Sequence, residues 1–115
     1  MAGSRSVISV AHIDPSPAAQ ARIAHLVERR PGFTLVDDPA RADVVLVDPE
    51  GDGMVRCSLL AAGGSRVVLY AVAPDPGLRL GAEVAGARAV VDKAAHPDTL
   101  FAAIRDAAPR RVLAA

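Results

Sequence analysis

Short aliphatic runs alternate along the chain with longer Ala-rich segments whose apolar residues recur at helical spacing. The aliphatic runs predict five strands, at Val7–Ala11, Phe33–Val36, Val44–Val47, Val67–Ala71 and Ala89–Val91. The third and fourth runs are apolar on both faces, which is typical of central strands in a parallel sheet. The alternation therefore predicts an α/β fold, with a parallel sheet covered by helices on both faces.

Four helices are predicted, one after each of the first, third, fourth and fifth strands. Ser16 and Pro17 form a capping and first-turn signal for the first helix, and His96-Pro97 opens the last. The third helix is expected from about Leu78 to Ala85. The apolar stripes expected to face the sheet are Ala19, Ile23, Leu26 and Val27; Val55, Leu59 and Ala62; Leu80 and Val84; and Leu100, Phe101, Ile104 and Ala108.

The connection between the second and third strands is too short for a helix. Only Asp37 to Ala42 separate them, whereas a parallel crossover usually takes a dozen residues or more. An extended link of about seven steps at roughly 3.3 Å spans on the order of 23 Å, enough to return along a short strand. We therefore expect one face of the sheet to be thinly covered, so that part of Val44 to Val47 or their neighbours is exposed and available to a partner, including a second copy.

Length, charge and cysteine content narrow the function classes. The 115 residues fit one domain over 1–115, with 108–115 as a tail or the stub of a linker to an output domain. The formal net charge is zero, which argues against direct nucleic-acid binding and against an acidic membrane surface. The single Cys57 cannot form a disulfide framework or a thiolate metal site, and no leader or membrane-spanning run is present. We expect a cytoplasmic protein.

Charged residues follow three of the predicted strands. Asp48 ends the third strand in the stretch VVLVDPEGDG, Asp14 follows the first, and Lys93, the one lysine among 13 basic residues, follows the fifth. Open α/β sheets place their sites at the carboxyl ends of strands, so these three side chains are expected to share a pocket. A turn explains Pro49 and the glycines after it, but an acidic cluster at this edge can also hold a cation or accept a phosphoryl group.

Together these elements resemble the receiver domain of bacterial two-component response regulators. The stretches that carry the resemblance are ERRPGFTLV, RADVVLVD, RVVLYA and AGARAVVDKAAHPDTLFAAIRDA, and the likeness covers nearly the whole chain. It implies a flavodoxin-like doubly wound sheet of order 2-1-3-4-5, a phosphoacceptor at Asp48 and its partner lysine at Lys93. It also implies Mg²⁺ near the acceptor, held by Asp14, Asp48 and the backbone carbonyl of Glu50, and a histidine kinase or output domain as partner.

The sequence departs from the family's pattern at several of its switch positions. Pro15 replaces the second residue of the acidic pair, Ala71 replaces the hydroxyl residue that ends the fourth strand, and Val90 replaces an aromatic residue. The loop after Asp48 is about three residues short and lacks the usual Met-Pro. The chain resembles an atypical, degenerate receiver.

Three functions remain open on these residues. The first is an atypical, non-enzymatic receiver that signals by contact with a protein partner or with itself as a homodimer, independently of phosphorylation. The second is a working phosphoacceptor of a phosphorelay, with Asp48 as nucleophile and Lys93 neutralising phosphoryl oxygens. The third is a domain that senses a small molecule in the vacated pocket. Lys93 also has a purely structural interpretation, as the ammonium that relieves repulsion between two carboxylates; His12 is interpreted as a surface or hydrogen-bonded residue, with metal ligation as the alternative.

Overall fold

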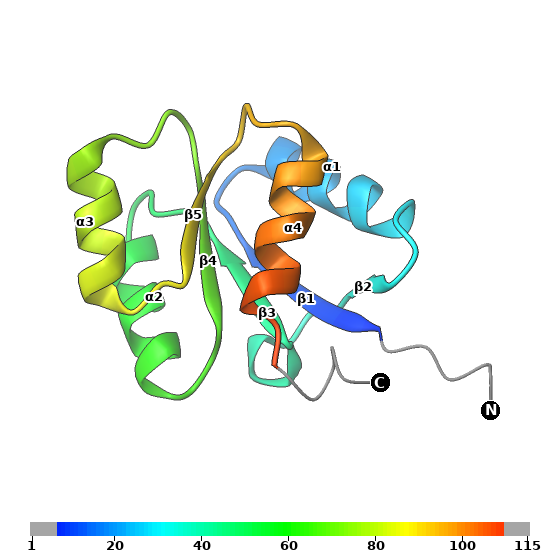
Figure 1. Cartoon of the computed structure of the whole chain (residues 1–115), viewed down its shortest axis with the longest axis horizontal. Helices are drawn as coiled ribbons and strands as arrows, with labels where there is room; N and C mark the ends of the chain where they lie inside the picture. Colours follow the sequence, from blue (N-terminus) through cyan, green and yellow to red (C-terminus); the bar gives the residue numbers. More distant parts are fainter. Residues whose placement is uncertain (1–6, 110–115) are drawn as a thin grey trace.

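The computed structural model describes residues 7–109, which form a five-stranded parallel sheet flanked by helices (Figure 1). The strands are β1 (Ile8–Ile13), β2 (Phe33–Leu35), β3 (Val44–Val47), β4 (Val67–Ala71) and β5 (Ala89–Asp92). The helices are α1 (Pro17–Glu28), α2 (Gly53–Ala62), α3 (Pro76–Ala85) and α4 (Pro97–Ala107). The strand order is β2-β1-β3-β4-β5, with every pair parallel, so the predicted fold is confirmed.

Side-chain caps begin three of the helices at the positions that the sequence signals indicated or near them. Ser16 Oγ accepts a hydrogen bond from the amide of Ala19 at 3.2 Å and caps α1. Asp75 Oδ1 accepts from the amide of Leu78 at 2.7 Å, so α3 begins at Pro76, two residues earlier than expected. His96 caps α4 through its ring nitrogen. In all three helices a proline occupies the first turn, where the missing N–H has no intrahelical partner in any case.

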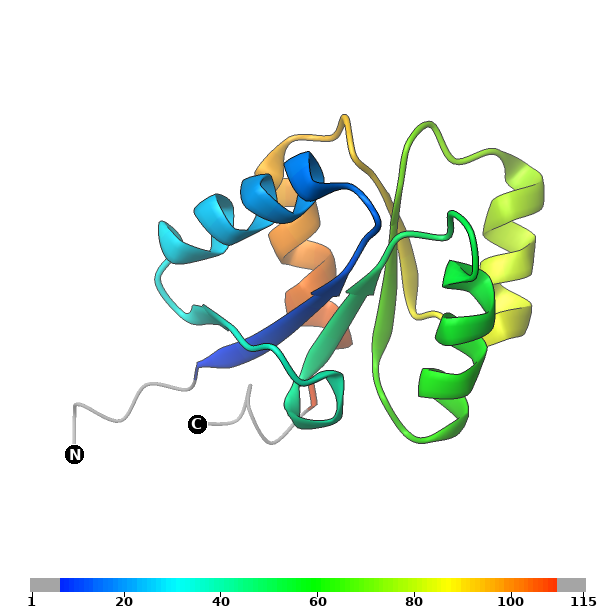
Figure 2. The ribbon, with the colours of Figure 1, turned by 180° about the vertical axis from the view of Figure 1, so that it is seen from behind.

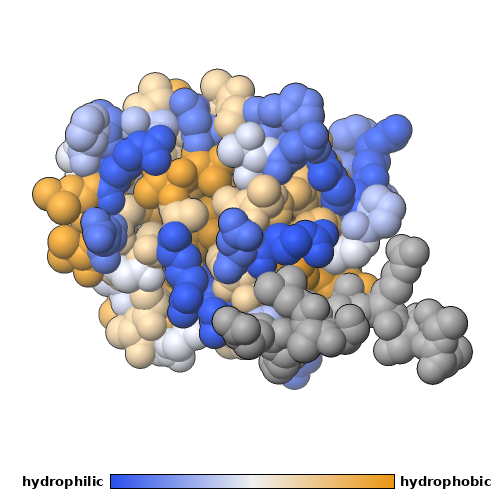
Figure 3. All heavy atoms as spheres, in the orientation of Figure 1, coloured by the Kyte–Doolittle hydropathy of each residue, from blue (hydrophilic) through white to orange (hydrophobic). Residues whose placement is uncertain are grey.

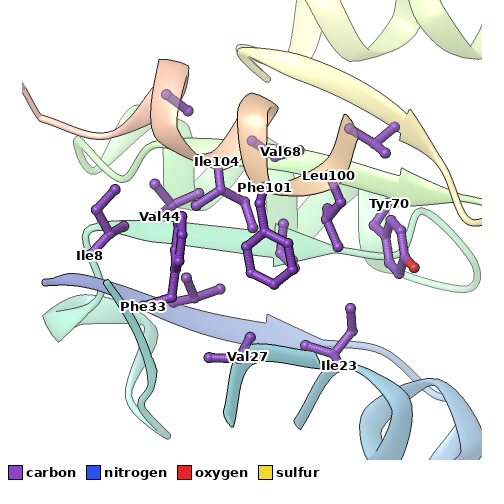
Figure 4. Packing of buried hydrophobic residues seen from close by; sticks show 14 of the residues in the cluster. Ile8, Ile23, Val27, Phe33, Val44, Val68, Tyr70, Leu100, Phe101 and Ile104 are labelled. Atoms are coloured by element: carbon purple, nitrogen blue, oxygen red, sulfur yellow. The ribbon is translucent and has the colours of Figure 1, made fainter. Parts of the chain in front are cut away.

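The two faces of the sheet carry cores of different character. Helices α1 and α4 cover one face, and α2 and α3 cover the other (Figures 1 and 2). The α1/α4 side is built from large side chains, including a T-shaped pair of Phe33 and Phe101 with ring centroids 4.8 Å apart (Figure 4). On the α2/α3 side the strands supply Val and Leu, while the helices supply mainly small residues such as Cys57 and Ala82.

The expected stripes of α2 and α3 are wrong, because their large aliphatic residues point outward. Val55 and Leu59 of α2 are 62% and 69% exposed, and Leu80 and Val84 of α3 are 64% and 82% exposed; Ala62 is exposed as well. Gly53 explains the orientation of α2, since a side chain there would overlap the backbone carbonyl of Asp48. The fully buried positions of α2 are the small residues Gly53 and Cys57, while its larger residues Met54 and Leu60 pack partly buried against the same core.

The link between β2 and β3 contains no α-helix, as expected, and consists of extended chain with one 3-10 turn, η1 (Pro39–Arg41). The prediction that the missing helix would expose Val44 to Val47 is wrong, since all four residues are fully buried. The link itself provides the cover. Asp43 is tied to β1, because its amide donates to Ser9 Oγ at 2.8 Å and its carboxylate accepts from the Ser9 amide at 2.9 Å.

Small residues on β1 allow this close crossing. Ala11 is 1% exposed and faces the α2/α3 core, and Val36 and Ala42 from the link pack against the same core. The eight-residue stretch from Val36 to Asp43 therefore covers part of the sheet that a helix would otherwise cover.

Two expectations concern the chain as a whole. Among residues 7–109, no helix combines the length and the hydrophobicity that crossing a membrane requires. The expected tail at 108–115 begins in the core, because Ala108 is 4% exposed, and its residues 110–115 lie outside the described part.

Candidate functional site

The structure brings Asp14, Asp48 and Lys93 together at the carboxyl ends of the strands. Lys93 Nζ lies 2.8 Å from Asp14 Oδ2 and 2.5 Å from Asp48 Oδ2. Both carboxylate residues are buried, at 6% and 4% exposure. The Asp48 amide donates to the carbonyl of Ile13 at 2.9 Å, which continues the β1–β3 pairing and sets the two acids side by side.

Backbone amides engage the remaining carboxylate oxygens. Asp14 Oδ1 accepts from the amide of Ser16 at 2.9 Å, where the chain turns into α1. Asp48 Oδ1 accepts from the amide of Glu50 at 2.7 Å, where the chain turns toward α2. Every carboxylate oxygen of the pair therefore has a donor, and Lys93 bridges the two that face each other.

The charges of this triad reinforce one another. Burial opposes ionisation of Asp14, but the hydrogen bonds from Lys93 and Ser16 and the lysine charge outweigh it, so the pKa of Asp14 is lowered. Burial also disfavours the ammonium of Lys93, yet its hydrogen bonds to Asp14 and Asp48 and their charges raise the pKa of Lys93. At neutral pH, Asp14 and Lys93 are both charged.

Three further residues, His12, Tyr70 and Arg22, surround the triad. Sequence reasoning assigned no role to Tyr70 or Arg22 and only a minor one to His12. His12 Nε2 lies 3.2 Å from Asp14 Oδ2, and its ring meets Tyr70 edge to face at a centroid distance of 6.3 Å. Arg22 Nη1 donates to the carbonyl of Lys93 at 3.0 Å and more weakly to the Tyr70 hydroxyl at 3.4 Å. His12 could have been placed by strand alternation, since it follows Val10 by two residues and shares its buried face.

His12 is a buried, hydrogen-bonded residue, and it is not a surface residue. Its side chain is only 4% exposed. Burial lowers the pKa of His12 even though Asp14 acts in the opposite direction, which favours the neutral imidazole. No group of three or more His, Cys, Asp or Glu side chains suited to a metal ion occurs within residues 7–109, so metal ligation by His12 is not supported.

The other candidate positions lie at the rim of the site. Glu50 and Asp52 are exposed, and Asp52 pairs with Arg56 at 3.2 Å. The Glu50 carbonyl, expected as a metal ligand, accepts a hydrogen bond from the amide of Gly53 at 3.0 Å. Ala71 is 2% exposed and contributes only its backbone carbonyl, which accepts from the Lys93 amide at 2.7 Å.

As arranged, these residues do not fit a magnesium site. Mg²⁺ is usually held by one or two carboxylates and several waters in octahedral geometry. Here the two carboxylate oxygens that a bridging cation would use both contact Lys93 Nζ, and the other two accept from backbone amides. A cation would have to displace the lysine.

An open cavity of about 550 Å³ adjoins the triad. Asp14, Asp48, Gly53 and Arg56 are among the residues that line it. Asp48 is therefore within reach of a small solute.

Comparisons with known proteins agree on the fold. No protein-family model matches the chain, and no curated protein matches it. Among solved structures, the chain is similar to the response regulator ChrA of a heme-sensing two-component system, with a TM-score of 0.75 and 26% identity over 89% of this chain and 57% of that one. It thus spans little more than half the length of that regulator.

Two other neighbours match with lower identity. One is a two-component response regulator of the LuxR family from Aurantimonas sp. SI85-9A1, with a TM-score of 0.76 and 24% identity over 88% of this chain and 84% of that one. The other is the response regulator domain of Thermotoga maritima CheB, with a TM-score of 0.73 and 19% identity over 88% and 96%. The chain is therefore a receiver-like domain, similar in fold to the receiver domains of two-component response regulators and divergent from them in sequence.

Proposed function

We propose that this chain is an atypical receiver domain that takes part in signal transduction through protein contact and does not depend on phosphorylation of Asp48. The observation that carries the proposal is the engagement of Asp48 on both oxygens, by Lys93 and by the Glu50 amide. A carboxylate held in this way is a pre-formed part of the fold, and its attack on a phosphodonor would require the ion pair to open.

The residue at position 71 supports the same conclusion. Ala71 has no hydroxyl with which to bond a phosphoryl oxygen, and a hydrogen bond to a charged group contributes about 1.5 to 3 kcal/mol. Turning a two-state element from 1:99 to 99:1 requires roughly 5.5 kcal/mol of differential affinity. Loss of this one bond removes a quarter to a half of that drive.

The proposal also names the cellular location of the domain and its candidate partners. We place the domain in the cytoplasm as a single, non-enzymatic unit over 1–115 that contacts a protein, with a histidine kinase, an output domain or a second copy as candidate partners. The zero net charge argues against direct nucleic-acid contact. Asp48, Lys93 and Asp14 then serve chiefly to hold the ends of β1, β3 and β5 together.

A working phosphoacceptor is the second candidate, and the open cavity beside Asp48 favours it. In this alternative Asp48 Oδ attacks the phosphorus of a phosphodonor, and the bond from phosphorus to the leaving atom breaks with its electron pair going to that atom, a ring nitrogen of a phosphohistidine or an oxygen of an acyl phosphate. Lys93 neutralises charge on the phosphoryl oxygens.

The test adds a small acyl phosphate with Mg²⁺, or beryllium fluoride as a mimic, and records intact mass and amide spectra. We expect little modification, with spectral changes confined to the neighbourhood of residue 48. The Asp48→Asn variant controls for modification elsewhere. Ala71→Thr restores a hydroxyl and should increase any spread of the changes. Stoichiometric modification of wild-type Asp48 with shifts extending through β4 and β5 would refute the proposal and favour the phosphoacceptor.

A further inference from the structure

The outer surfaces of α2 and α3 carry four large aliphatic residues that the protein's own cores do not use. Val55 and Leu59 on α2 and Leu80 and Val84 on α3 are between 62% and 82% exposed, and we call them the outer-helix patch. Figure 3 shows hydrophobic atoms gathered at the edge of the molecule formed by α3. Apolar patches of this kind on a small domain usually mark a contact surface.

The two halves of the patch belong to one surface because α2 and α3 pack side by side (Figure 2). Their contact is close, with glycines of α3 and its C-cap facing α2. A side chain at Gly81 would meet Met54 of α2, and one at Gly86 would press on Ala61. Residues 55 and 59 recur at one helical turn, as do residues 80 and 84, so each pair forms a continuous stripe along its helix.

Charges beside the patch indicate what covers it. Arg79 and Glu83 lie one turn apart on α3, next to Leu80 and Val84, and both are exposed. Glu83 forms no ion pair with any residue in the range 7–109, and the hydrogen bond from Arg79 to the Val90 carbonyl is long, at 3.5 Å, and exposed. Both side chains are therefore available to a partner.

This charge order is complementary to itself. A two-fold axis reverses the direction of α3 in the second copy, so Leu80 of one copy meets Val84 of the other, and Arg79 of each copy faces Glu83 of the other. We propose that the outer-helix patch is the interface of a symmetric homodimer in which α3 packs antiparallel against α3 of a second copy. This inference deepens the proposed contact-based function by naming the partner and the surface.

The area of the patch indicates a small interface. Complete burial of a Val or Leu side chain removes on the order of 60 to 120 Å² of apolar area, so the four partly exposed residues supply on the order of 300 Å² per copy. A standard interface buries about 800 Å² per partner. The patch forms the apolar centre of an interface at the small end of this class, and the dimer is weak, with a dissociation constant on the order of 10 to 100 µM.

Sedimentation of the full chain over a concentration series up to about 0.5 mM tests the proposal against this range. We expect a monomer–dimer equilibrium that Leu80→Glu weakens at least tenfold. The matched control is Leu35→Glu, since Leu35 is 40% exposed on β2 at the opposite edge of the sheet, and it should leave the equilibrium unchanged. Thermal melts of both variants verify that each is folded. A wild-type chain that stays monomeric, or a dimer that Leu80→Glu leaves intact, refutes the interface.

A charge swap tests the two-fold geometry itself. Arg79→Glu and Glu83→Arg each break both symmetric pairs and should weaken the dimer by a factor of about 2 to 30. The double variant regains self-complementarity, so it should dimerise with itself at close to the wild-type affinity and fail to pair with the wild-type chain. Equal weakening in the double variant, or mixed dimers with wild type, would refute the antiparallel arrangement. None of these outcomes depends on Asp48, so the phosphodonor test of the proposed function stands or fails separately.

Discussion

Replacing Lys93 by Met tests whether the triad holds the carboxyl ends of the strands together. Methionine retains the length of the side chain and removes its charge, so Asp14 and Asp48 are left buried without the ammonium that lies 2.8 and 2.5 Å from them. Removing one partner from a buried ion pair typically costs about 3 to 5 kcal/mol. For a domain whose total stability is about 5 to 15 kcal/mol, that loss should lower the melting temperature by on the order of 10 to 30 °C.

The pH dependence of the variant provides a more specific signature than its melting temperature. In the wild type, the lowered pKa of Asp14 contributes stability that is present above the ordinary carboxyl value and is lost as pH falls through the lower folded value. The raised pKa of Lys93 contributes stability that is lost only above pH 10.5. Without Lys93 the two acids share one proton in the folded state, which raises a carboxyl pKa there. The variant should therefore regain stability as pH falls from 7 toward 5.

Urea unfolding of both proteins at pH 7 and pH 5 measures this difference. Arg56→Met is a matched control, because it removes a cation from the half-exposed Arg56–Asp52 pair and should cost at most about 1 kcal/mol. Combining Lys93→Met with Asp48→Asn should restore part of the loss by removing one of the two unpaired charges. If Lys93→Met costs no more than Arg56→Met, or if its loss is the same at both pH values, the triad does not stabilise the fold in the way described.

Two smaller effects follow from the same region. Because burial lowers the pKa of His12, its contribution to stability is complete above pH 6.5 and declines as pH falls below that value; His12→Leu should flatten this acid limb in urea unfolding, and an unchanged limb would contradict the assignment. Gly53→Ala places a methyl group against the Asp48 carbonyl and should cost about 1 to 3 kcal/mol. Gly63→Ala, where the nearest atoms lie at 3.5 Å and φ is −83°, should change stability by less than about 0.5 kcal/mol, and equal losses in the two variants would argue against the close packing of α2.

The convergence of the triad was open to prediction from sequence because it depends on topology alone. Once β1, β3 and β5 are placed in one parallel sheet, residues that follow them must meet at one edge. The alternation of aliphatic runs sufficed to place β3 and β4 in the centre. The neighbours of the triad were harder to foresee, because Arg22 reaches Lys93 from α1 across 71 positions of sequence.

Hydrophobic periodicity could not predict which face of α2 and α3 packs against the sheet. The stripes at residues 55 and 59 and at 80 and 84 are apolar at the right spacing, but spacing does not say whether a stripe faces inward. The close approach of Gly53 to the Asp48 carbonyl at the end of β3 decided it, and that approach depends on the conformation of the short turn between them, which periodicity does not describe. The burial of Val44 to Val47 was misjudged for a related reason, since bonds between Asp43 and Ser9 bring an extended link over β1.

The same link has a consequence for chain continuity. Residues 37–41 cross the protein surface with all but Pro39 exposed. Apart from a long hydrogen bond of 3.5 Å from Ser9 Oγ to the Arg41 carbonyl, the polar and core contacts of the crossing are made at either end of them, by Val36, Ala42 and Asp43. The peptide bonds at the 3-10 turn connect two pieces that already share a sheet, because β1 pairs with β2 on one side and with β3 on the other. The domain can therefore be viewed as two complementing fragments, one with β1, α1 and β2 and one with the remaining elements, joined at a point where cleavage would sever the backbone without opening either core.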